Sequence, residues 1–515
     1  MSKSDHTKPV SAFDELGYKN TIKELTKKIG EHYTSFGAPW VIGYSGGKDS
    51  TAVLQLVWMS LEALPPSQRK HQVHVISTDT LVENPVVAFW VTKQLQKMQL
   101  AAISKGIPIE THRLTPEPED SFWVNLIGKG YPAPRPMFRW CTSRLKINPS
   151  NKFITEIIKK HGESILALGM RKSESSMRAM SMENIEKRLG RVQEYLTPNS
   201  ELQNSYVYTP IENWGNDDVW QFLLQNSETP WRTDNKEILE FYKGATKDRE
   251  CPMAYTTGTS SCGDSRFGCW VCTLVSQDRS MLAMIQNDQE KEWMQPMLEY
   301  RDLFNIKEDR DRRDFRRIDG RVQLFKDRTI HGPYWQDDRE DLLRRLLEVQ
   351  KLVKSKKPDD VLDFDIITIE ELIAIREIWL EEKDEVEDSL PRIYEEVTGE
   401  KFPVEQTDVN RAFGWDEMQI LKEVCGEDKL HYQLVRGLIS QSQRYRTMAH
   451  RSGLFDALEQ VITKHFYEDE EDAEGRARRY RDRKIDIKEK IELLQCSPFV
   501  RQTESRTETE ANQES

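Results

Sequence analysis

The sequence predicts an α/β fold in which a parallel sheet is flanked by helices and followed by a charged, mostly helical C-terminal extension. Short apolar runs alternate with segments of helical periodicity over the first third of the chain, as in consecutive β-α units. A Gly-Gly turn directly follows the first apolar run. The chain has 515 residues, 31 % of them charged and 37 % hydrophobic, so two or three domains with a strongly charged surface are expected.

The individual elements follow from the spacing of apolar residues. Between Tyr18 and Phe36 these residues recur at helical intervals, and a glycine and a proline then end the helix. The expected strands are 40–44, 73–76, 107–114 and 165–169, and the expected helices are 18–36, 51–64 and 85–104. Ligands of such a sheet bind where the strands end, which is where the Gly-Gly turn, Asp79 and Arg171 fall.

The second half of the chain differs in composition from the first. Charge dominates from Asp309 to Arg317, and a helix is expected at 337–354, followed by further charged helices. We therefore expect an N-terminal domain at 1–305 and a charged helical domain at 306–495. Residues 496–515 are polar and are expected to form a disordered tail.

Three segments of the charged region are rich in arginine, namely 310–317, 444–446 and 476–481. Arginines beside aromatic residues could contact nucleic-acid phosphates, and solvated helix faces are the alternative interpretation. The net charge of −12 argues against a simple nucleic-acid coat, although a local basic patch acts on its own face.

The sequence predicts a cytoplasmic protein with no membrane partner. No run of 18 apolar residues occurs, and the polar N-terminus lacks the apolar core of a signal peptide. In a reducing compartment, disulfides are not expected.

The hexapeptide Ser45–Ser50, Ser-Gly-Gly-Lys-Asp-Ser, is predicted to bind phosphate. Its glycines let the backbone turn sharply towards an anion, and the N–H groups of the loop and helix start can hold phosphate oxygens. Its lysine adds a cation and its serines add hydroxyl donors. Its aspartate alone would repel phosphate, so a bridging Mg²⁺ is expected. The spacing differs from that of Walker A, and an ordinary strand-to-helix turn is the alternative.

This hexapeptide resembles the phosphate loop of the ATP pyrophosphatase family, whose fold is adenine nucleotide α-hydrolase-like. The family includes adenylating amidotransferases and tRNA thiolases, with the sulfonucleotide reductases as relatives. The resemblance implies that ATP is bound and cleaved between its α- and β-phosphates. The implied ATP-binding residues are Ser45, Gly46, Gly47, Lys48, Asp49, Ser50, Asp79, Arg171 and Arg178.

Three further segments, 139–146, 169–178 and 210–220, resemble the phosphoadenylyl-sulfate reductase branch. Their cations could neutralise a triphosphate or a sugar-phosphate backbone, and they are Arg144, Lys146, Arg171 and Arg178. Reductases with a C-terminal nucleophile carry a Glu-Cys-Gly-Leu-His-like element. This sequence lacks one, which disfavours simple sulfonucleotide reduction.

Four of the seven cysteines lie in one short segment, which indicates metal binding. Cys269 and Cys272 form a C-x-x-C pair, and Cys262 lies seven residues before it. The iron–sulfur reductases resemble this pattern with a further cysteine in a Trp-Cys segment, which makes Cys141 the implied fourth ligand and Cys251 the alternative. Four thiolates suit a [4Fe–4S] cluster, and structural zinc is the other candidate.

The whole chain resembles the sulfur-inserting proteins of DNA phosphorothioation. The resemblance implies that a DNA backbone phosphate is adenylated with release of pyrophosphate, after which sulfur replaces a non-bridging oxygen. It makes Lys48, Asp49, Cys141 and Arg171 the candidate catalytic residues. The implied partners are DNA, a cysteine desulfurase as sulfur donor, and other DNA phosphorothioation proteins, including a DNA-processing ATPase.

Two kinds of alternative remain open at this stage. A tRNA thiolase or a sulfonucleotide reductase would use the same phosphate loop. A non-catalytic iron–sulfur sensor would bind nucleotide or DNA without releasing pyrophosphate.

Overall fold

The computed structural model describes residues 11–245, 267–326, 328–404, 413–446, 448 and 450–495. The chain divides into two compact units. Unit 1 comprises Met1–Asn125, Ala133–Ile306 and Arg345–Glu371, and unit 2 comprises Leu126–Pro132, Lys307–Arg344 and Leu372–Ser515. Every helix within the described residues falls short of the length and apolarity that crossing a lipid bilayer requires.

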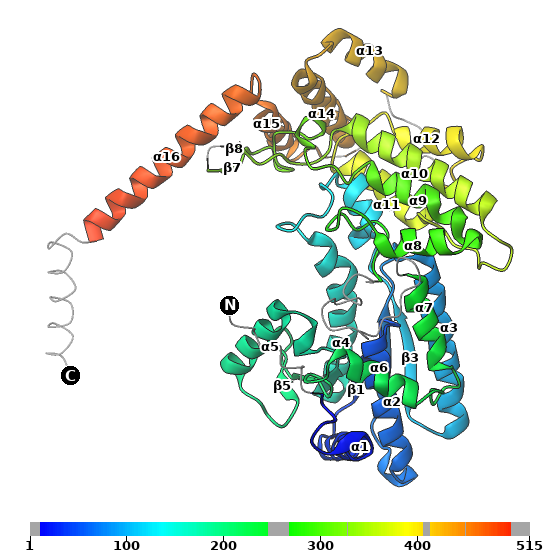
Figure 1. Ribbon diagram of the computed structural model, residues 1–515. Coiled ribbons are helices and arrows are strands. Elements are labelled where there is room, and N and C mark those ends of the chain that lie inside the picture. Colours follow the sequence, from blue (N-terminus) through cyan, green and yellow to red (C-terminus); the bar gives the residue numbers. More distant parts are fainter. Residues whose placement is uncertain are drawn as a thin grey trace, which may run out of the picture. The chain divides into compact units, whose positions relative to one another are not determined.

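Six described strands of unit 1 form one sheet in the order β3-β2-β1-β4-β6-β5 (Figure 1). They are β1 Trp40–Gly43, β2 Val73–Thr78, β3 Ile109–Leu114, β4 Ser164–Ala167, β5 Leu196–Pro198 and β6 Ser205–Tyr208. Neighbouring strands are parallel except β5 and β6, which confirms the predicted mostly parallel sheet. The strand order reverses beside β1, and this reversal is where ligands bind in open α/β sheets.

Helices cover both faces of the sheet. The first four are α1 Gly17–Ser35, α2 Lys48–Ala63, α3 Pro85–Lys105 and α4 Asn148–His161. Trp40 and Ile42 of β1 are buried in the core that α1, α2 and α3 complete. Val41 lies between them and faces the other side, where Ile154 of α4 packs on it. This period of two places apolar residues on both faces of the central strands.

The remaining helices of unit 1 follow the sheet strands or extend beyond them. They are α5 Ser176–Leu189, α6 Asn216–Gln225, α7 Asn235–Gly244, α8 Arg279–Asn287 and α9 Gln295–Asp302. Trp214 and Trp220 are buried in the main core, as expected for structural aromatic residues. Strands β5 and β6 were not expected from the sequence, because they are only three and four residues long.

Helix α2 begins earlier than the sequence predicts. The expected start was residue 51, but Gly47 is the N-cap, so Lys48, Asp49 and Ser50 form the first helical turn. The hydroxyls of Ser50 and Thr51 both donate to the carbonyl oxygen of Gly47, at 3.1 and 2.8 Å. The phosphate loop is therefore shorter than its hexapeptide, and half of the motif is the start of a helix.

Unit 2 is mostly helical, which confirms the expected helical C-terminal region. Its helices include part of α10 Gln336–Lys356 and of α11 Ile369–Glu381, followed by α12 Ser389–Thr398, α13 Trp415–Cys425, α14 Lys429–Arg446, α15 Leu454–His465 and α16 Glu470–Gln495. A short hairpin of β7 Leu324–Phe325 and β8 Arg328–Thr329 precedes them.

Within the charged run that begins at Asp309, four residues form neither a solvated face nor an exposed basic patch. Asp309, Arg313, Asp314 and Arg316 are each at most 9 % exposed. Arg313 pairs with Asp309 at 3.2 Å, and Arg316 pairs with Asp314 at 2.6 Å. Both sequence-based interpretations of this run were wrong for these four residues, because a run of alternating charges can neutralise itself inside a fold.

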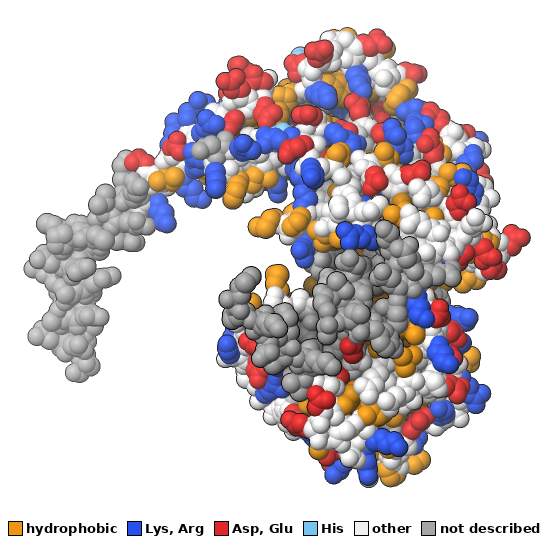
Figure 2. Space-filling view, viewed as in Figure 1, with side chains coloured by type: hydrophobic (Ala, Val, Ile, Leu, Met, Phe, Trp, Pro, Cys, Tyr) orange, Lys and Arg blue, Asp and Glu red, His pale blue; other side chains and the backbone are white. Residues whose placement is uncertain are grey.

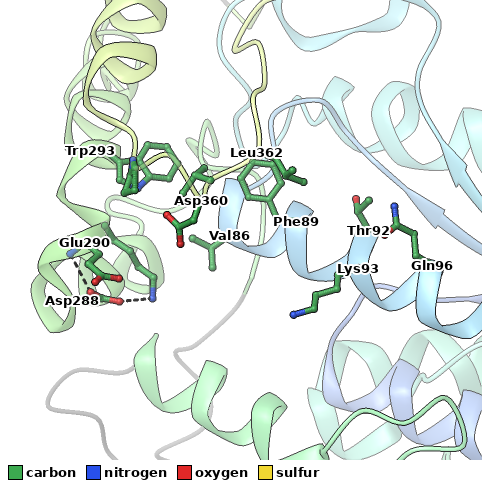
Figure 3. A pocket seen from close by; sticks show the side chains of 13 residues that line it. Val86, Phe89, Thr92, Lys93, Gln96, Asp288, Glu290, Trp293, Asp360 and Leu362 are labelled. Carbon is green, nitrogen blue, oxygen red and sulfur yellow. Dashed lines mark hydrogen bonds and ion pairs between the residues drawn. The ribbon is translucent and has the colours of Figure 1, made fainter.

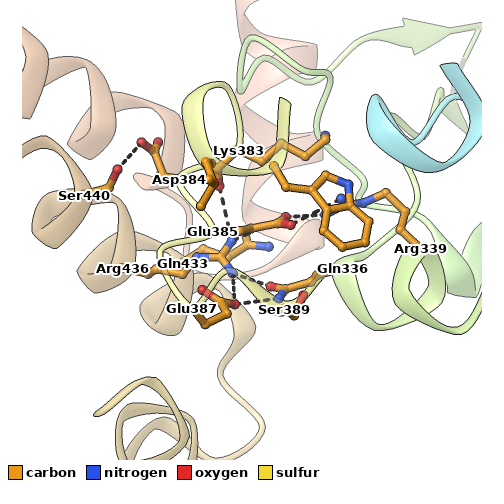
Figure 4. A network of polar contacts seen from close by, with 12 residues as sticks. Gln336, Arg339, Lys383, Asp384, Glu385, Glu387, Ser389, Gln433, Arg436 and Ser440 are labelled. Carbon is orange, nitrogen blue, oxygen red and sulfur yellow. Dashed lines mark hydrogen bonds and ion pairs between the residues drawn. The ribbon is translucent and has the colours of Figure 1, made fainter. Parts of the chain in front are cut away.

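A second buried network joins α10, the loop after α11, and α14 (Figure 4). Arg339 pairs with Glu385, and Arg436 pairs with Glu387 at 3.1 Å. Gln336 also donates to Glu387, at 2.5 Å. Because these charges lie away from water, each depends on its partner for compensation.

The arginine-rich segment of α16 is exposed but largely paired within its own helix. Arg476 pairs with Asp472 at 2.9 Å and Arg478 with Glu474 at 2.8 Å. Figure 2 shows acidic side chains interspersed with the basic ones over the helices of unit 2 that face the viewer. This geometry favours the interpretation of 476–481 as a solvated helix face.

Candidate functional site

The phosphate loop turns sharply at two glycines after β1. Gly46 has φ of +75°, and a Cβ atom there would lie 2.5 Å from a methyl group of Val91. No residue with a side chain fits this position without displacing α3. Gly47 follows in an extended conformation and is the N-cap of α2, so the loop meets the first N–H groups of the helix, which have no partner within the helix itself.

Two serines close the loop. The backbone N–H of Ser45 donates to the hydroxyl oxygen of Ser50 at 3.2 Å, and the two hydroxyl oxygens are also 3.2 Å apart. Both hydroxyls therefore lie at the same turn, beside the start of α2. Hydroxyls in this arrangement can reorient to donate to a phosphate oxygen.

Asp49 joins the phosphate loop to the segment after β4. Its Oδ2 lies 3.0 Å from Nζ of Lys48, and its Oδ1 accepts a hydrogen bond from Nε of Arg171 at 2.7 Å. Arg171 is only 4 % exposed and also donates to the hydroxyl oxygen of Ser173 at 2.8 Å. The sequence-predicted residues Lys48, Asp49 and Arg171 are therefore brought into contact.

This contact alters the reason for expecting magnesium. The sequence argument treated Asp49 as an uncompensated negative charge beside phosphate. Lys48 and Arg171 already neutralise that carboxylate, so the premise was wrong. A Mg²⁺ requirement remains a prediction about the ATP complex, in which phosphate oxygens would supply ligands.

Gly169 lets the strand end approach the helix start. A Cβ atom on Gly169 would lie 2.7 Å from the carbonyl carbon of Asp49 and 2.9 Å from the backbone nitrogen of Ser50. The close approach of these two backbones places Arg171 against Asp49. The geometry of the site thus requires a glycine at position 169.

Tyr242 is a site residue that the sequence analysis missed. Its hydroxyl oxygen accepts a hydrogen bond from the backbone N–H of Lys48 at 3.3 Å, and its ring lies 5.6 Å from the Lys48 ammonium. The two residues are far apart in the sequence, and no motif marks Tyr242. Only the packing of α7 against the loop reveals the contact.

Two of the expected ATP ligands are engaged elsewhere. Asp79, just after β2, pairs with Arg113 at 3.0 Å and accepts a hydrogen bond from the backbone N–H of Leu81 at 2.9 Å. Arg178 lies in the first turn of α5, partly exposed, and pairs with Glu174 at 3.3 Å. The structure brings neither side chain into contact with the phosphate loop.

The C-x-x-C segment lies along the residues that follow β2. The backbone N–H of Trp270 donates to the carbonyl oxygen of Val82 at 3.0 Å, and Glu83 and Cys269 form an antiparallel bridge. The sulfur of Cys269 is 3.2 Å from the hydroxyl oxygen of Thr80. Since β1 and β2 are adjacent and in register, the cysteines lie near the same edge of the sheet as the phosphate loop.

Electrostatic interactions connect Cys141, Cys269 and Cys272 with Lys146. The negative charge of Cys269 is the main cause that raises the pKa of Lys146, against the effect of burial. Burial raises the pKa of Cys269 to about 11, while Lys146 acts to lower it. Burial, and then Cys272, raise the pKa of Cys141. The sequence analysis assigned Lys146 to a phosphate, but the structure places it among the thiols.

Buried residues on both sides hold these cysteines. Arg301 is 1 % exposed and donates to the carbonyl oxygen of Cys272 through Nε at 2.9 Å and Nη2 at 2.6 Å. It also donates to the carbonyl oxygens of Val275 and Ser276. Trp270 packs against Trp123, with ring centroids 5.7 Å apart. Arg301 and the contact between Trp123 and Trp270 therefore hold the C-x-x-C segment in place.

Cys141, Cys269 and Cys272 have the ligand chemistry of a thiolate-bound metal group, although their sulfur atoms do not all lie within 4.8 Å of one another. Their thiols are close enough to influence one another, and a bound cation would favour the thiolate that burial disfavours. Thiolates suit an iron–sulfur cluster or zinc. Cys262 and Cys251, the predicted third cysteine and the alternative ligand, lie outside the described residues.

A separate pocket of about 430 Å³ lies in unit 1 between α3 and two later segments (Figure 3). Phe89, Trp293 and Leu362 form its apolar wall, while Lys93 and Asp360 are among its charged residues. None of the phosphate-loop residues or described cysteines lines this pocket. We therefore do not assign it to the candidate site.

Part of the chain, including this site, is similar to known proteins. Residues 39–274 match the model of the phosphoadenosine phosphosulfate reductase domain. An uncharacterized protein of Methanocaldococcus jannaschii, MJ0066, is 28 % identical over 208 residues, which are 40 % of this chain and 33 % of that protein. The chain thus spans about a third of the length of this curated relative.

Two solved structures are similar at low sequence identity. One is phosphoadenylyl-sulfate reductase from Candida auris in a phosphate complex, with a TM-score of 0.25 and 12 % identity, covering 43 % of this chain and 91 % of that chain. The other is the U34-tRNA thiolase NcsA from Methanococcus maripaludis with its [4Fe-4S] cluster, with a TM-score of 0.25 and 14 % identity, covering 57 % of this chain and 82 % of that chain.

The matched segment begins just before β1 and ends just after the C-x-x-C pair, so it contains both halves of the candidate site. It also contains the whole six-stranded sheet. Residues 39–274 of this chain are thus similar to the phosphoadenosine phosphosulfate reductase domain.

Proposed function

We propose that this protein is an iron–sulfur ATP pyrophosphatase that acts in DNA phosphorothioation, in the manner of the DNA phosphorothioation protein DndC. The observation that carries the proposal is that the phosphate loop and the cysteine segment both lie at the ends of neighbouring strands in the sheet of unit 1. The contact of Lys48, Asp49 and Arg171 follows β1 and β4, and the C-x-x-C segment lies along the end of β2. An anion-binding loop beside clustered thiols supports nucleotide activation coupled to sulfur chemistry.

In the proposed first step, a non-bridging oxygen of a DNA phosphate attacks the α-phosphorus of ATP. One phosphorus–oxygen bond forms, the bond from the α-phosphorus to the bridging oxygen breaks, and pyrophosphate leaves. The product is a mixed anhydride of the DNA phosphate and AMP. Lys48, the N–H groups at the start of α2, and the serine hydroxyls would stabilise the departing charge.

In the proposed second step, sulfur at the oxidation level of sulfide attacks the DNA phosphorus. The new phosphorus–sulfur bond replaces the bond to the bridging oxygen, and AMP leaves with that oxygen. No net oxidation occurs, because hydrosulfide loses only its proton. Sulfur that arrives as a persulfide of a cysteine desulfurase would need a thiol reductant to supply two electrons.

The residues of this chain would hold the groups that these steps need. Cys262, Cys269 and Cys272 would be ligands of a [4Fe–4S] cluster, with Cys141 as the implied fourth ligand and Cys251 as its alternative. With all four thiolates bound, every iron would be coordinated, so the cluster would supply electron transfer and not an open position for a sulfur ligand. Arg171 would fix Asp49 and, through it, the orientation of Lys48. DNA, a cysteine desulfurase and the other DNA phosphorothioation proteins, including a DNA-processing ATPase, are the proposed partners.

The decisive experiment detects phosphorothioate dinucleotides in DNA from cells that carry the gene with its neighbours. We expect the modification in the wild type and its loss in Lys48→Ala and in Cys141→Ser. Cys425→Ser, a substitution on α13 of unit 2, is the matched cysteine control and should retain it. Unchanged DNA sulfur in both site variants would overturn the proposal.

Three further measurements separate the alternatives. A tRNA thiolase would leave DNA unmodified, and the same variants would lose thiolated nucleosides from tRNA. A sulfonucleotide reductase would, with a thiol reductant, release sulfite from a sulfonucleotide and leave the nucleotide as the other product. A non-catalytic sensor would bind ATP without releasing pyrophosphate from the anaerobically purified protein. Each of these results rejects the proposed DNA activity in a different way.

A further inference from the structure

A cluster of two histidines and a glutamate lies on β2 and β3, outside the candidate site. In the parallel register, His74 is opposite Glu110, and Ile76 is opposite His112. Alternate residues of a strand share one face, so Glu110 and His112 lie on the same face of β3 and meet His74 across the strand pair. Within the described part of the chain, these three side chains form the one group whose potential metal ligands all lie within 4.8 Å of one another.

The distances fit three positions around a single ion. Nδ1 of His74 lies 3.0 Å from Nε2 of His112. The same carboxylate oxygen, Oε2 of Glu110, lies 3.7 Å from the first nitrogen and 3.8 Å from the second. A tetrahedral zinc ion with bonds of about 2.0–2.1 Å separates its ligand atoms by about 3.3–3.4 Å. The three atoms therefore need to move only by about half an ångström.

The surroundings of the two imidazoles disfavour their charged, protonated form. Burial lowers the pKa of His74 to about 4, and the neighbouring His112 lowers it further in the same direction. Burial also lowers the pKa of His112. One of the two facing nitrogens carries the hydrogen of their 3.0 Å contact, so a metal ion that binds both nitrogens takes the place of that proton.

Phe153 of α4 restricts the orientation of both rings. Its ring centroid lies 5.6 Å from that of His74 and 4.7 Å from that of His112. His74 is only 8 % exposed, whereas the side chain of Glu110 is 51 % exposed. One side of the cluster is thus a packed wall and the other is open to water.

The local charges oppose one another. Lys160 and His161, near the end of α4, act on His74 as positive charges, while Glu110 acts on it as a negative charge. A metal cation here would be attracted by the carboxylate of Glu110 and repelled by the ammonium group of Lys160. Two neutral nitrogens and one carboxylate suit zinc and related divalent transition metals better than Ca²⁺ or Mg²⁺, which prefer oxygen ligands.

We propose that His74, Glu110 and His112 bind one zinc ion, with water in the fourth position. The ion would tie β3 to β2 from the face that α4 covers. This site is independent of the thiol ligands and of the proposed activity, and neither histidine belongs to a motif that the sequence analysis singled out.

The test uses the full-length protein, purified anaerobically with its native cysteine-bound group. Zinc is titrated by calorimetry, and the zinc-loaded protein is measured by X-ray absorption at the zinc edge. We expect one zinc ion to bind with nitrogen and oxygen neighbours at about 2.0–2.1 Å and no sulfur neighbour. His112→Ala and Glu110→Gln should abolish this binding event, and zinc should raise the melting temperature of the wild type but of neither variant.

His161→Asn is the matched control, because it removes a nearby histidine that is not a proposed ligand. It should retain the zinc stoichiometry of the wild type. Glu110→Gln changes a half-exposed side chain, so it keeps the test valid if loss of a ring disturbs folding. Equal zinc binding by the wild type and by folded Glu110→Gln and His112→Ala proteins, or sulfur neighbours at about 2.3 Å, would overturn the proposal.

Discussion

Nε of Arg171 donates to Oδ1 of Asp49 at 2.7 Å, while the other oxygen of the same carboxylate faces Lys48 at 3.0 Å. The carboxylate therefore links a cation from the segment after β4 to a cation at the start of α2. Because Arg171 is buried, this contact fixes the position of both α2 side chains relative to the loop. Removing one member should alter the others.

Arg171→Ala tests the role of this contact in ATP cleavage. The substitution leaves Asp49 with one cation and lets its charge face the bound phosphates. We expect pyrophosphate release to fall on the order of 100-fold or more. Arg178→Ala, which breaks only a partly exposed pair on α5, should change the rate little. Equal losses in the two variants would contradict the assigned contact.

Gly169→Ala tests the close approach of strand end and helix start. The added methyl group would lie 2.7 Å from the Asp49 backbone, so α2 must shift. We expect a loss of about 1–3 kcal/mol in unfolding free energy and weaker ATP binding. In the control Gly244→Ala, the new Cβ meets nothing within 4 Å, so ATP affinity should be unchanged. Calorimetric titration with a non-hydrolysable ATP analogue gives the affinities.

Arg301→Met tests the support of the C-x-x-C segment. The variant keeps the apolar volume but removes the Arg301 donors to the carbonyl oxygens of Cys272, Val275 and Ser276, of which Ser276 keeps Asn305 as a donor at 3.0 Å. Buried carbonyl groups without donors disfavour the native loop. We expect a lower content of iron and acid-labile sulfide per protein chain. Arg188→Met, on the exposed side of α5, is the control and should match the wild type.

Arg436→Met tests the buried network of unit 2. Arg436 is 4 % exposed, and its loss leaves Glu387 without its cation. We expect destabilisation by about 3–5 kcal/mol, measured as the shift of the urea unfolding transition of unit 2. Arg344→Met breaks an exposed pair with Glu396 and should cost about 0–1 kcal/mol. Comparable effects would mean that burial of the network contributes nothing.

Unit 2 should also lose stability in mild acid. Burial, and then Arg316, lower the pKa of His465 from 6.5 to about 4; Arg436 acts in the same direction and Asp314 against it. Between these values the unfolded chain binds a proton that the folded unit does not bind. The unfolding free energy of unit 2 is therefore not reduced by His465 above pH 6.5. As the pH falls towards 4, proton binding by His465 in the unfolded chain lowers this free energy by up to about 3 kcal/mol.

His465→Gln isolates this contribution. The variant cannot bind the proton in either state, so its unfolding midpoint should vary less between pH 6.5 and 4 than that of the wild type. Fluorescence-detected urea unfolding at several pH values measures the difference. Parallel curves for the two proteins would show that His465 does not titrate on unfolding.

The sequence predicted the sheet well because its central strands are apolar on both faces and its loop has a distinctive composition. From the sequence, Lys48 and Arg171 could be placed only at the same edge of the sheet. That both pair with Asp49 depends on the close packing at Gly169, which the sequence does not reveal. It could not predict Tyr242 or Arg301, because each acts on a segment distant in the sequence. It misjudged the run at Asp309 because charge composition does not reveal whether opposite charges are buried together.

Residues 345–371 belong to unit 1 although they follow a long stretch of unit 2. Nε1 of Trp123 donates to the carbonyl oxygen of Ile366 at 2.7 Å, and Phe364 packs against both Phe89 and Trp293. A chain cut at residue 305 would lack these partners. The C-terminal extension is consequently not exchangeable on its own: recombination between relatives would have to transfer residues 345–371 together with the residues that pack against them, or leave the core of unit 1 incompletely filled.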